Sequence, residues 1–203
     1  SLSTIAATSF FPSKPFGCYG DGGACFTNDN ELANKIRRIS KHGQTKRYFH
    51  TDIGINGRID TIQAAILLEK LKIFPNEIIS RQEVASMYDN ALDEIVKIPK
   101  IVSYAKSVWA QYTVRLEKNV NRFELISDLK KNGIPSMVYY QKPCHLQKGY
   151  KNFPTTNNES LKNSEEASAT VLSLPMINYS KKKEIQTVIN QIYKIISVHT
   201  KNT

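Results

Sequence analysis

The segment of residues 9–26, SFFPSKPFGCYGDGGACF, is the feature that most constrains how this chain can fold. It holds two prolines and four glycines. Proline fixes φ and cannot donate a backbone hydrogen bond, and glycine favours turns, so neither a helix nor a regular strand can run through the segment. Lys14 lies between Pro12 and Pro15, which hold its backbone extended or turned. The segment therefore predicts a turned loop whose backbone a bulky ligand can approach closely.

The side chains around Lys14 favour a reactive amine. Phe10, Phe11, Phe16 and Tyr19 flank it, and aromatic rings can desolvate an amine and make it a nucleophile toward a carbonyl carbon. A plain surface lysine in a turn is the alternative. The glycines do not match a Walker A loop, where they precede the lysine, or a GxGxxG motif at a helix start.

Length and composition are those of a globular chain. The 203 residues, 40% of them hydrophobic, suffice for one ordinary domain or for a large domain piece and a small one. The net charge of +10 allows phosphate-bearing ligands or a polyanionic partner. Because the basic residues are spread along the chain, most are expected on solvated faces, and their distribution does not favour nucleic-acid binding. No apolar stretch approaches the roughly 18 to 20 residues of a membrane span.

The cysteines and histidines point to a reducing compartment, taken as the cytoplasm. Cys18, Cys25 and Cys144 are odd in number and form no CxxC pair. The four histidines lack ligand spacing, so no metal site is expected. The first residues, SLSTIAATSFFPSK, have neither the basic nor the apolar region of a signal peptide.

Apolar periodicity predicts helices and strands along the rest of the chain. The expected helices cover residues 29–43, 59–74, 76–95, 121–132 and 182–198, and the expected strands cover 109–116 and 136–140. Pro75 is expected to end the second helix. The third is expected to point these side chains inward: Ile79, Val84, Met87, Tyr88 and Leu92. The strand–helix alternation after Pro99 predicts a small α/β domain over residues 96–203, after the end of a larger domain over 1–95.

The lysine segment carries a family resemblance. The run TSFFPSKPFGCYGDGGACFTND resembles the active-site lysine segment of the DegT/DnrJ family of sugar aminotransferases, pyridoxal-phosphate enzymes that aminate nucleotide-linked keto sugars. Four later segments resemble that family in the same order: IGINGRIDTIQAAILLEKL, VWAQYTVRL, GIPSMVYYQKPCHLQKGY and LSLPMINY. The resemblance implies an α/β fold, a fragment of the fold type I pyridoxal-phosphate transferases. It covers the end of the large domain and the small C-terminal α/β domain, about half the family's usual length.

The resemblance also implies roles for particular residues. Lys14 would bind pyridoxal 5'-phosphate covalently and move the proton between substrate and cofactor. Some relatives carry a histidine there and act as dehydratases, so a lysine favours transamination. Ser9 would bind the cofactor phosphate, with a plain strand-end serine as the alternative. Asn56 would reach the phosphate of the neighbouring subunit's cofactor, which implies a homodimer with shared sites.

Three further residues are candidates for substrate binding. Arg58 suits a phosphate or a carboxylate by its fork geometry, although an arginine at a helix start is often structural. Tyr140 and His145 resemble residues near the sugar-nucleotide entrance, with a local hydrogen bond as the alternative for the histidine. The family commonly has leucine where Cys144 stands and histidine where Asn178 stands. These two departures bear on substrate fit and not on the lysine chemistry.

The resemblance implies an aminotransferase that moves an amino group, with glutamate as donor, to a nucleotide-linked keto sugar used for surface polysaccharides. The segment YYQKPCHLQKGY is most similar to members that act on UDP-linked 3-keto N-acetylated hexuronic acids. The alternatives are a basic nucleic-acid-binding domain and a catalytically silent remnant of the fold. No segment matches the aromatic residue or the carboxylate that contact the cofactor ring in the family. We therefore expect these residues alone to bind the cofactor poorly.

Overall fold

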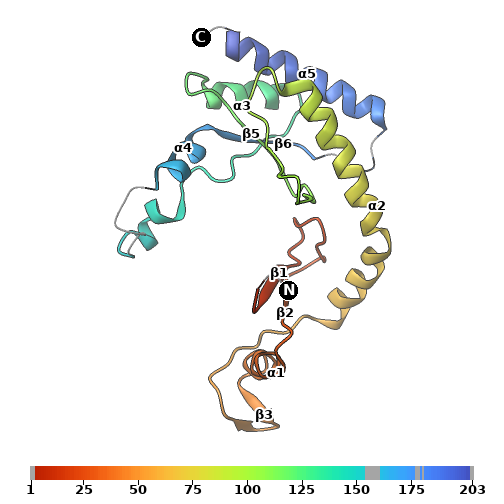
Figure 1. The fold of residues 1–203 in the computed structure, drawn as a ribbon, viewed down its shortest axis with the longest axis vertical. Coiled ribbons are helices and arrows are strands. Elements are labelled where there is room, and N and C mark those ends of the chain that lie inside the picture. Colours follow the sequence, from red (N-terminus) through yellow and green to blue (C-terminus); the bar gives the residue numbers. More distant parts are fainter. Residues whose placement is uncertain (1–2, 154–160, 177–178, 180, 202–203) are drawn as a thin grey trace. The chain divides into compact units, whose positions relative to one another are not determined.

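The computed structural model describes residues 3–153, 161–176, 179 and 181–201 (Figure 1). The chain divides into two compact units, Ser1–Asn76 and Glu77–Thr203. The domain division at residues 95 and 96 stays a prediction. Among the described residues, no helix has the length and apolar character needed to cross a membrane.

The first unit holds two short hairpins and a helix. Strands β1 (Ala6–Ser9) and β2 (Gly23–Phe26) pair antiparallel. Strands β3 (Gln44–Lys46) and β4 (Phe49–His50) pair antiparallel in turn. Between them lies α1 (Asn30–Ile39), a shorter helix than expected. Asp29 caps it by accepting hydrogen bonds from the Glu31 and Leu32 amides, which satisfies two of the free N–H groups of the first turn.

Helix α2 (Thr61–Leu92) corrects the expected break at Pro75. It is one helix of 32 residues with Pro75 inside it, and it continues from the first unit into the second. A proline inside a helix removes one hydrogen bond and costs about 3 kcal/mol. Tertiary packing on both sides offsets this cost: Phe74 lies against Phe16, with ring centroids 4.9 Å apart, and Val84 and Tyr88 are buried in the core of the second unit.

The second unit combines helices with a small antiparallel sheet. Strand β5 (Tyr112–Arg115) pairs with β6 (Val171–Leu174), so that Tyr112 faces Leu174. Single bridges extend the sheet at both edges, Lys97 to Arg115 and Met137 to Ser173. The strand expected over residues 136–140 is therefore reduced to one bridging residue. The other elements are α3 (Arg122–Lys131), η1 (Cys144–Leu146), η2 (Lys148–Tyr150), α4 (Lys162–Thr170) and α5 (Lys182–Lys201).

The second unit has an apolar core built from α2, the β5–β6 sheet, α3 and α5. The last helix buries one of its faces in this core, with the side chains of Ile185, Ile189, Ile192 and Ile196. Val84, Tyr88 and Leu92 of α2 are buried as well, and Met87 packs against them. Ile79 is 56% exposed, so its expected inward position is wrong.

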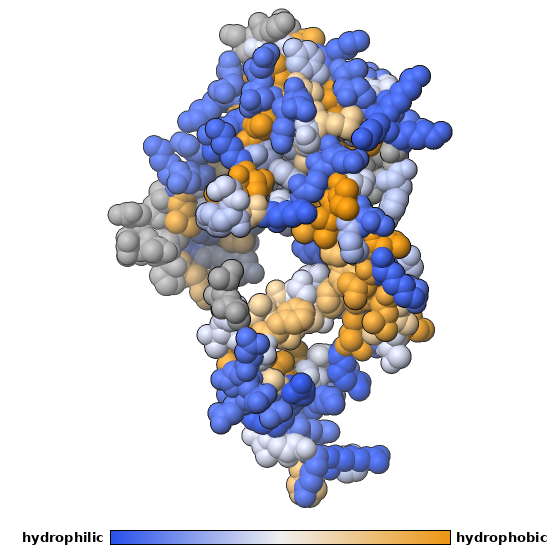
Figure 2. Space-filling model, turned by 45° about the vertical axis from the view of Figure 1, so that its right-hand side comes forward, coloured by the Kyte–Doolittle hydropathy of each residue, from blue (hydrophilic) through white to orange (hydrophobic). Residues whose placement is uncertain are grey.

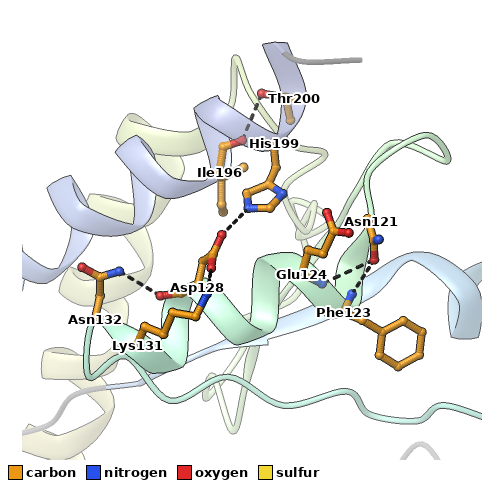
Figure 3. A network of polar contacts seen from close by, with 9 residues as sticks. All are labelled: Asn121, Phe123, Glu124, Asp128, Lys131, Asn132, Ile196, His199 and Thr200. Carbon is orange, nitrogen blue, oxygen red and sulfur yellow. Dashed lines mark hydrogen bonds and ion pairs between the residues drawn. The ribbon is translucent and has the colours of Figure 1, made fainter.

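A polar network fastens α3 to α5 at the edge of this core (Figure 3). Asp128 of α3 accepts a hydrogen bond from Lys131 at 2.7 Å on one carboxylate oxygen and contacts His199 Nε2 of α5 at 3.1 Å on the other. These hydrogen bonds, that of Lys131 first, lower the pKa of Asp128 below its ordinary value. Asn121 caps the start of α3, and Gly133 follows its end with a φ of 73°.

Candidate active site

The lysine loop connects β1 to β2 and is closed by backbone hydrogen bonds. The Lys14 amide donates to the Phe11 carbonyl at 2.9 Å, which closes a tight turn that contains Pro12 and is followed by Pro15. The Cys18 amide donates to the Phe10 carbonyl, and the Phe10 amide donates to the Gly22 carbonyl, both at 2.8 Å. The predicted turned loop is therefore present, and the two strands hold both of its ends.

Gly17 and Cys18 fix the inner side of this loop. A Cβ atom at Gly17 would lie 2.5 Å from the Phe11 carbonyl oxygen and 3.1 Å from that of Lys14, so only glycine fits there without a backbone shift. The Cys18 thiol is buried, and its Sγ atom lies 3.1 Å from the Phe10 carbonyl oxygen and 3.0 Å from that of Gly20, so the one S–H can donate to either. Lys14 therefore stands on a turn with little freedom to rearrange.

The aromatic residues do not surround the Lys14 amine as the sequence suggested. Lys14 is exposed, and Tyr19 is 75% exposed. Phe10 packs edge to face on Phe16, which in turn packs on Phe74 of α2. The rings anchor the base of the loop to the helix, so the expected desolvation of the amine by these neighbours is wrong for the chain as described.

Two side chains of α2 that the sequence did not single out also hold this loop. Gln63 accepts a hydrogen bond from the Tyr19 amide at 2.8 Å, and the Lys70 ammonium donates to the Gly17 carbonyl at 2.5 Å. Both lie more than forty positions along the chain from their partners. Their helical spacing gave no signal, because the pattern of a helix face does not reveal which loop it will meet.

Ser9 occupies the last position of β1, five residues before Lys14, and is exposed. Its hydroxyl oxygen accepts a hydrogen bond from the Phe11 amide at 3.2 Å. The serine is thus both a strand-end residue and a member of the lysine loop. In this hydrogen bond the hydroxyl acts as an acceptor, so its hydrogen is not used by it.

The structure joins Asn56 and Arg58 directly. Arg58 Nε donates to Asn56 Oδ1 at 3.0 Å, and both residues are exposed. The turn that carries them rests on the end of α1, where the Gly57 amide donates to the Ser40 carbonyl at 2.9 Å and Asn56 forms a bridge with Lys41. An amide and a guanidinium therefore point out from one fixed turn.

Close backbone packing supports this turn. Gly43 has a φ of 73°, and a Cβ there would lie 1.7 Å from the Asp52 carbonyl oxygen, so a side chain is excluded. Asp52 is paired with Arg38 at 2.8 Å. The hydrogen bond from Arg38 is the main cause that lowers the pKa of the Asp52 carboxyl.

Tyr140 and His145 lie in the second unit and differ in exposure. Tyr140 is 73% exposed and lines a pocket of about 410 Å³ together with Tyr139, Lys142 and Cys144. The His145 side chain is 14% exposed, and its Nε2 atom lies 3.0 Å from Oε1 of Glu165. The local hydrogen bond that the sequence left open for His145 is thus present, with a partner twenty positions away. Asn178 lies outside the described residues.

The candidate residues therefore form three local groups. Lys14 and Ser9 share one loop of the first unit, Asn56 and Arg58 share a turn of the same unit, and Tyr140 and His145 belong to the second unit. Within the residues that the structure describes, no cluster of His, Cys, Asp or Glu could hold a metal ion. The exposed donors are an amine, a hydroxyl, an amide and a guanidinium, a set suited to a carbonyl and a phosphate.

Comparison with known proteins extends these observations. The chain is 50% identical, over 88% of its length, to UDP-2-acetamido-2-deoxy-3-oxo-D-glucuronate aminotransferase of Pseudomonas aeruginosa and spans 48% of that protein. It matches a crystal structure of a DegT DnrJ EryC1 StrS aminotransferase from Brucella abortus with a TM-score of 0.87 and 44% identity, over 97% of this chain and 51% of that one.

A further match is NtdA from Bacillus subtilis with bound cofactor PMP. The TM-score is 0.84 and the identity 26%, over 96% of this chain and 46% of that one. The chain thus spans about half the length of the relatives it matches. These structures confirm the α/β fold of a pyridoxal-phosphate transferase fragment. Residues 1–193 match the model of the DegT/DnrJ/EryC1/StrS aminotransferase family, and the chain belongs to that family.

Proposed function

We propose that this chain is part of a pyridoxal-phosphate-dependent aminotransferase that moves an amino group from glutamate to a nucleotide-linked keto sugar. The observation that carries the proposal is the exposed Lys14 amine on a turn where only glycine fits at position 17. The chain that holds it is 50% identical, over 88% of its length, to a sugar-nucleotide aminotransferase. Family membership favours this function over nucleic-acid binding, for which the net charge is the main argument.

The described residues fit the cofactor by the chemistry of their donors. Lys14 offers a primary amine to the aldehyde of pyridoxal phosphate. The Ser9 hydroxyl, on the same loop, can donate to the phosphate. The amide of Asn56 and the guanidinium of Arg58 can do the same from their shared turn. The sequence has no match to the aromatic residue and the carboxylate that contact the ring in the family, so these residues are expected in the half of the relatives that this chain does not span.

When bound, pyridoxal phosphate supplies an electron sink for the carbon that gains or loses the amino group. This chain contributes the group that moves the proton and the loop that positions it. The Lys14 amine takes and returns the proton at that carbon, and the loop anchored by Phe16, Gln63 and Lys70 holds the amine in place while it does so. Because the residues that contact the ring are expected outside this chain, we expect these 203 residues alone to turn over poorly.

The substrate proposal is a UDP-linked 3-keto N-acetylated hexuronic acid in the synthesis of surface polysaccharide. The relative that is 50% identical is named for a substrate of that class. The pocket lined by Tyr140 and Lys142 offers an aromatic ring and a cationic group to a nucleoside diphosphate. A cytoplasmic location belongs to the same proposal, supported by the free cysteines Cys18, Cys25 and Cys144.

A homodimer with shared sites is also part of the proposal. Asn56 and Arg58 are exposed on the first unit and joined to each other, which leaves their outer edges free for a group from a second subunit. Mixing a Lys14→Ala chain with an Asn56→Ala chain should restore part of the activity, because one site of the mixed dimer keeps both native groups. Absence of recovery after proven subunit exchange would show that each site is built within one subunit.

Borohydride reduction tests the central assignment. The chain is combined with an N-terminal half from a close relative and incubated with pyridoxal phosphate. Reduction should then fix a pyridoxyl group on Lys14 alone, as read by peptide mass mapping. Lys14→Ala should leave folding intact and lower transamination at least a thousandfold. Lys41→Ala is the matched control and should keep activity. A label spread over several lysines would refute the assignment.

A further inference from the structure

The pocket at Tyr140 has two walls that are distant in the sequence. Tyr139, Tyr140 and Cys144 form one wall, from the segment that runs into η1. Ser164, Ala167 and Ser168 form the other, from α4. A pocket built in this way keeps its shape only while the two segments stay together.

His145 and Glu165 join these two walls. His145 follows Cys144 of the first wall, and Glu165 follows Ser164 of the second, so the pair lies one position behind the lining on each side. The His145 Nε2 atom lies 3.0 Å from Glu165 Oε1. The side chains of His145 and Glu165 are 14% and 36% exposed, so the contact is partly shielded from water, which strengthens it.

We propose that His145 and Glu165 are positioning residues that clamp η1 to α4 and so set the width of the Tyr140 pocket. His145 then acts through its neighbours on the pocket wall and does not itself touch the ligand. That the pocket receives the nucleotide part of the substrate rests on the proposed function. The clamp itself rests on the geometry of this chain alone.

The surroundings of the pair support a structural clamp. The main chain of Glu165 is fixed as well, because its amide donates to the Leu161 carbonyl and its carbonyl accepts from the Ser168 hydroxyl at 2.8 Å. Glu165 therefore presents its carboxylate from a rigid first turn of α4. The next residue, Glu166, pairs with Lys118 at 3.4 Å and thus offers a matched control on the same helix.

Hydrogen exchange of the 203-residue chain, resolved by mass spectrometry, tests the clamp without any need for activity. His145→Phe keeps a ring but removes the donor, and Glu165→Met keeps the length but removes the acceptor. Each should speed exchange in residues 144–150 about tenfold, as expected for loss of a hydrogen bond to a charged group. The double variant should be no faster than the faster single variant, because each single variant already breaks the contact between His145 and Glu165. Glu165→Gln, which keeps an acceptor oxygen, should lie between wild type and Glu165→Met.

Two outcomes would overturn the clamp: unchanged exchange in residues 144–150 for Glu165→Met, or additive effects in the double variant. Glu166→Gln should leave that segment unchanged, and an equal effect there would likewise argue against a specific pair. Titration with UDP separates the clamp from the proposed function. Weaker UDP binding by both single variants, with Glu166→Gln unaffected, supports the link to the substrate. Altered exchange with no UDP binding to any form supports the clamp and counts against the pocket as a nucleotide site.

Discussion

The two units of the chain differ in what holds them together. In the described part of the first unit, the buried hydrophobic side chains are Cys18 and Leu67, whereas the second unit contains the whole core cluster. Apolar side chains of α2 before Pro75 stay exposed instead: Ile62, Leu68, Leu71 and Ile73. Figure 2 shows hydrophobic surface gathered on the right-hand side of the view. The first unit keeps its shape through backbone turns, glycines and a few long-range hydrogen bonds.

This difference separates the source of stability from the positioning of the lysine loop. Burial of apolar area supplies most of the stability of a folded chain, so the second unit is expected to dominate the unfolding free energy. Backbone hydrogen bonds and excluded Cβ positions fix local geometry with little burial, which is what the loop of Lys14 requires. The single tryptophan, Trp109, is buried in the core, so its fluorescence reports on the second unit alone.

The largest expected effect on stability comes from a matched pair of leucines. Leu129→Ala removes a fully buried side chain from α3 and should lower the free energy of unfolding by about 2–5 kcal/mol in denaturant titrations followed by Trp109. Leu68→Ala, at a position 66% exposed on α2, should change it by less than about 0.5 kcal/mol. Equal losses would show that the first unit shares in the core.

The second comparison uses two glycine variants and measures how well Lys14 on its loop is labelled by the cofactor. Gly17→Ala places a Cβ against the Phe11 carbonyl, so the turn must shift, and pyridoxyl labelling of Lys14 should fall about tenfold, the equivalent of about 1.4 kcal/mol. A Cβ atom at Gly149 has no atom within 4 Å, so Lys14 should be labelled normally in the Gly149→Ala variant. Trp109 fluorescence should show unchanged unfolding in both variants. Normal labelling of Gly17→Ala would mean that the turn geometry does not control the amine.

The third comparison uses two helix caps of the same kind. Asn121→Ala removes the cap of α3 and should cost about 1 kcal/mol in unfolding followed by Trp109, because α3 contributes Leu125 and Leu129 to the core. Asp29→Ala removes the cap of α1, which has no fully buried residue, and should only speed local hydrogen exchange in residues 30–33. A change in the unfolding transition followed by Trp109 fluorescence for Asp29→Ala would contradict the idea that the first unit contributes little to the stability of the second.

The smallest effect is a pH dependence in acid. The pKa of Asp128 is lower in the folded chain than its ordinary value of 3.8, chiefly through Lys131 and then His199. A carboxyl with a depressed folded pKa stabilises the fold above its unfolded pKa and loses that contribution as the pH falls through the folded value. The difference in unfolding midpoint between wild type and Asp128→Asn should therefore be present at pH 6 and shrink below about pH 4.

Asp52→Asn provides the control for this titration. The Asp52 carboxyl also has a lowered pKa, chiefly through its hydrogen bond with Arg38, but Asp52 belongs to the first unit. The Trp109 transition should therefore keep its wild-type pH dependence in this variant. A wild-type pH profile for Asp128→Asn would rule out the network of Figure 3 as a source of acid sensitivity.

Several features of the fold and the site follow from the sequence by itself. The turn at Lys14 is set by Pro12, Pro15 and Gly17, whose allowed dihedral angles leave few alternatives. The caps at Asp29 and Asn121 follow from side chains that bond amides two or three residues ahead. The roles of Ser9 and Asn56 as ligands stay predictions. All of these signals are local, because they act through covalent geometry or through neighbours in the chain.

Only the tertiary structure decided the longer-range features. It carried α2 through Pro75, turned Phe16 onto Phe74 instead of toward the Lys14 amine, and gave His145 its partner Glu165. Each of these features depends on which segments come into contact after folding. The residues that neighbour a position in the sequence do not indicate which distant segment will contact it. Packing energy from distant partners exceeded the local preference of Pro75 to break a helix, which is why the sequence placed a boundary there and the folded chain has none.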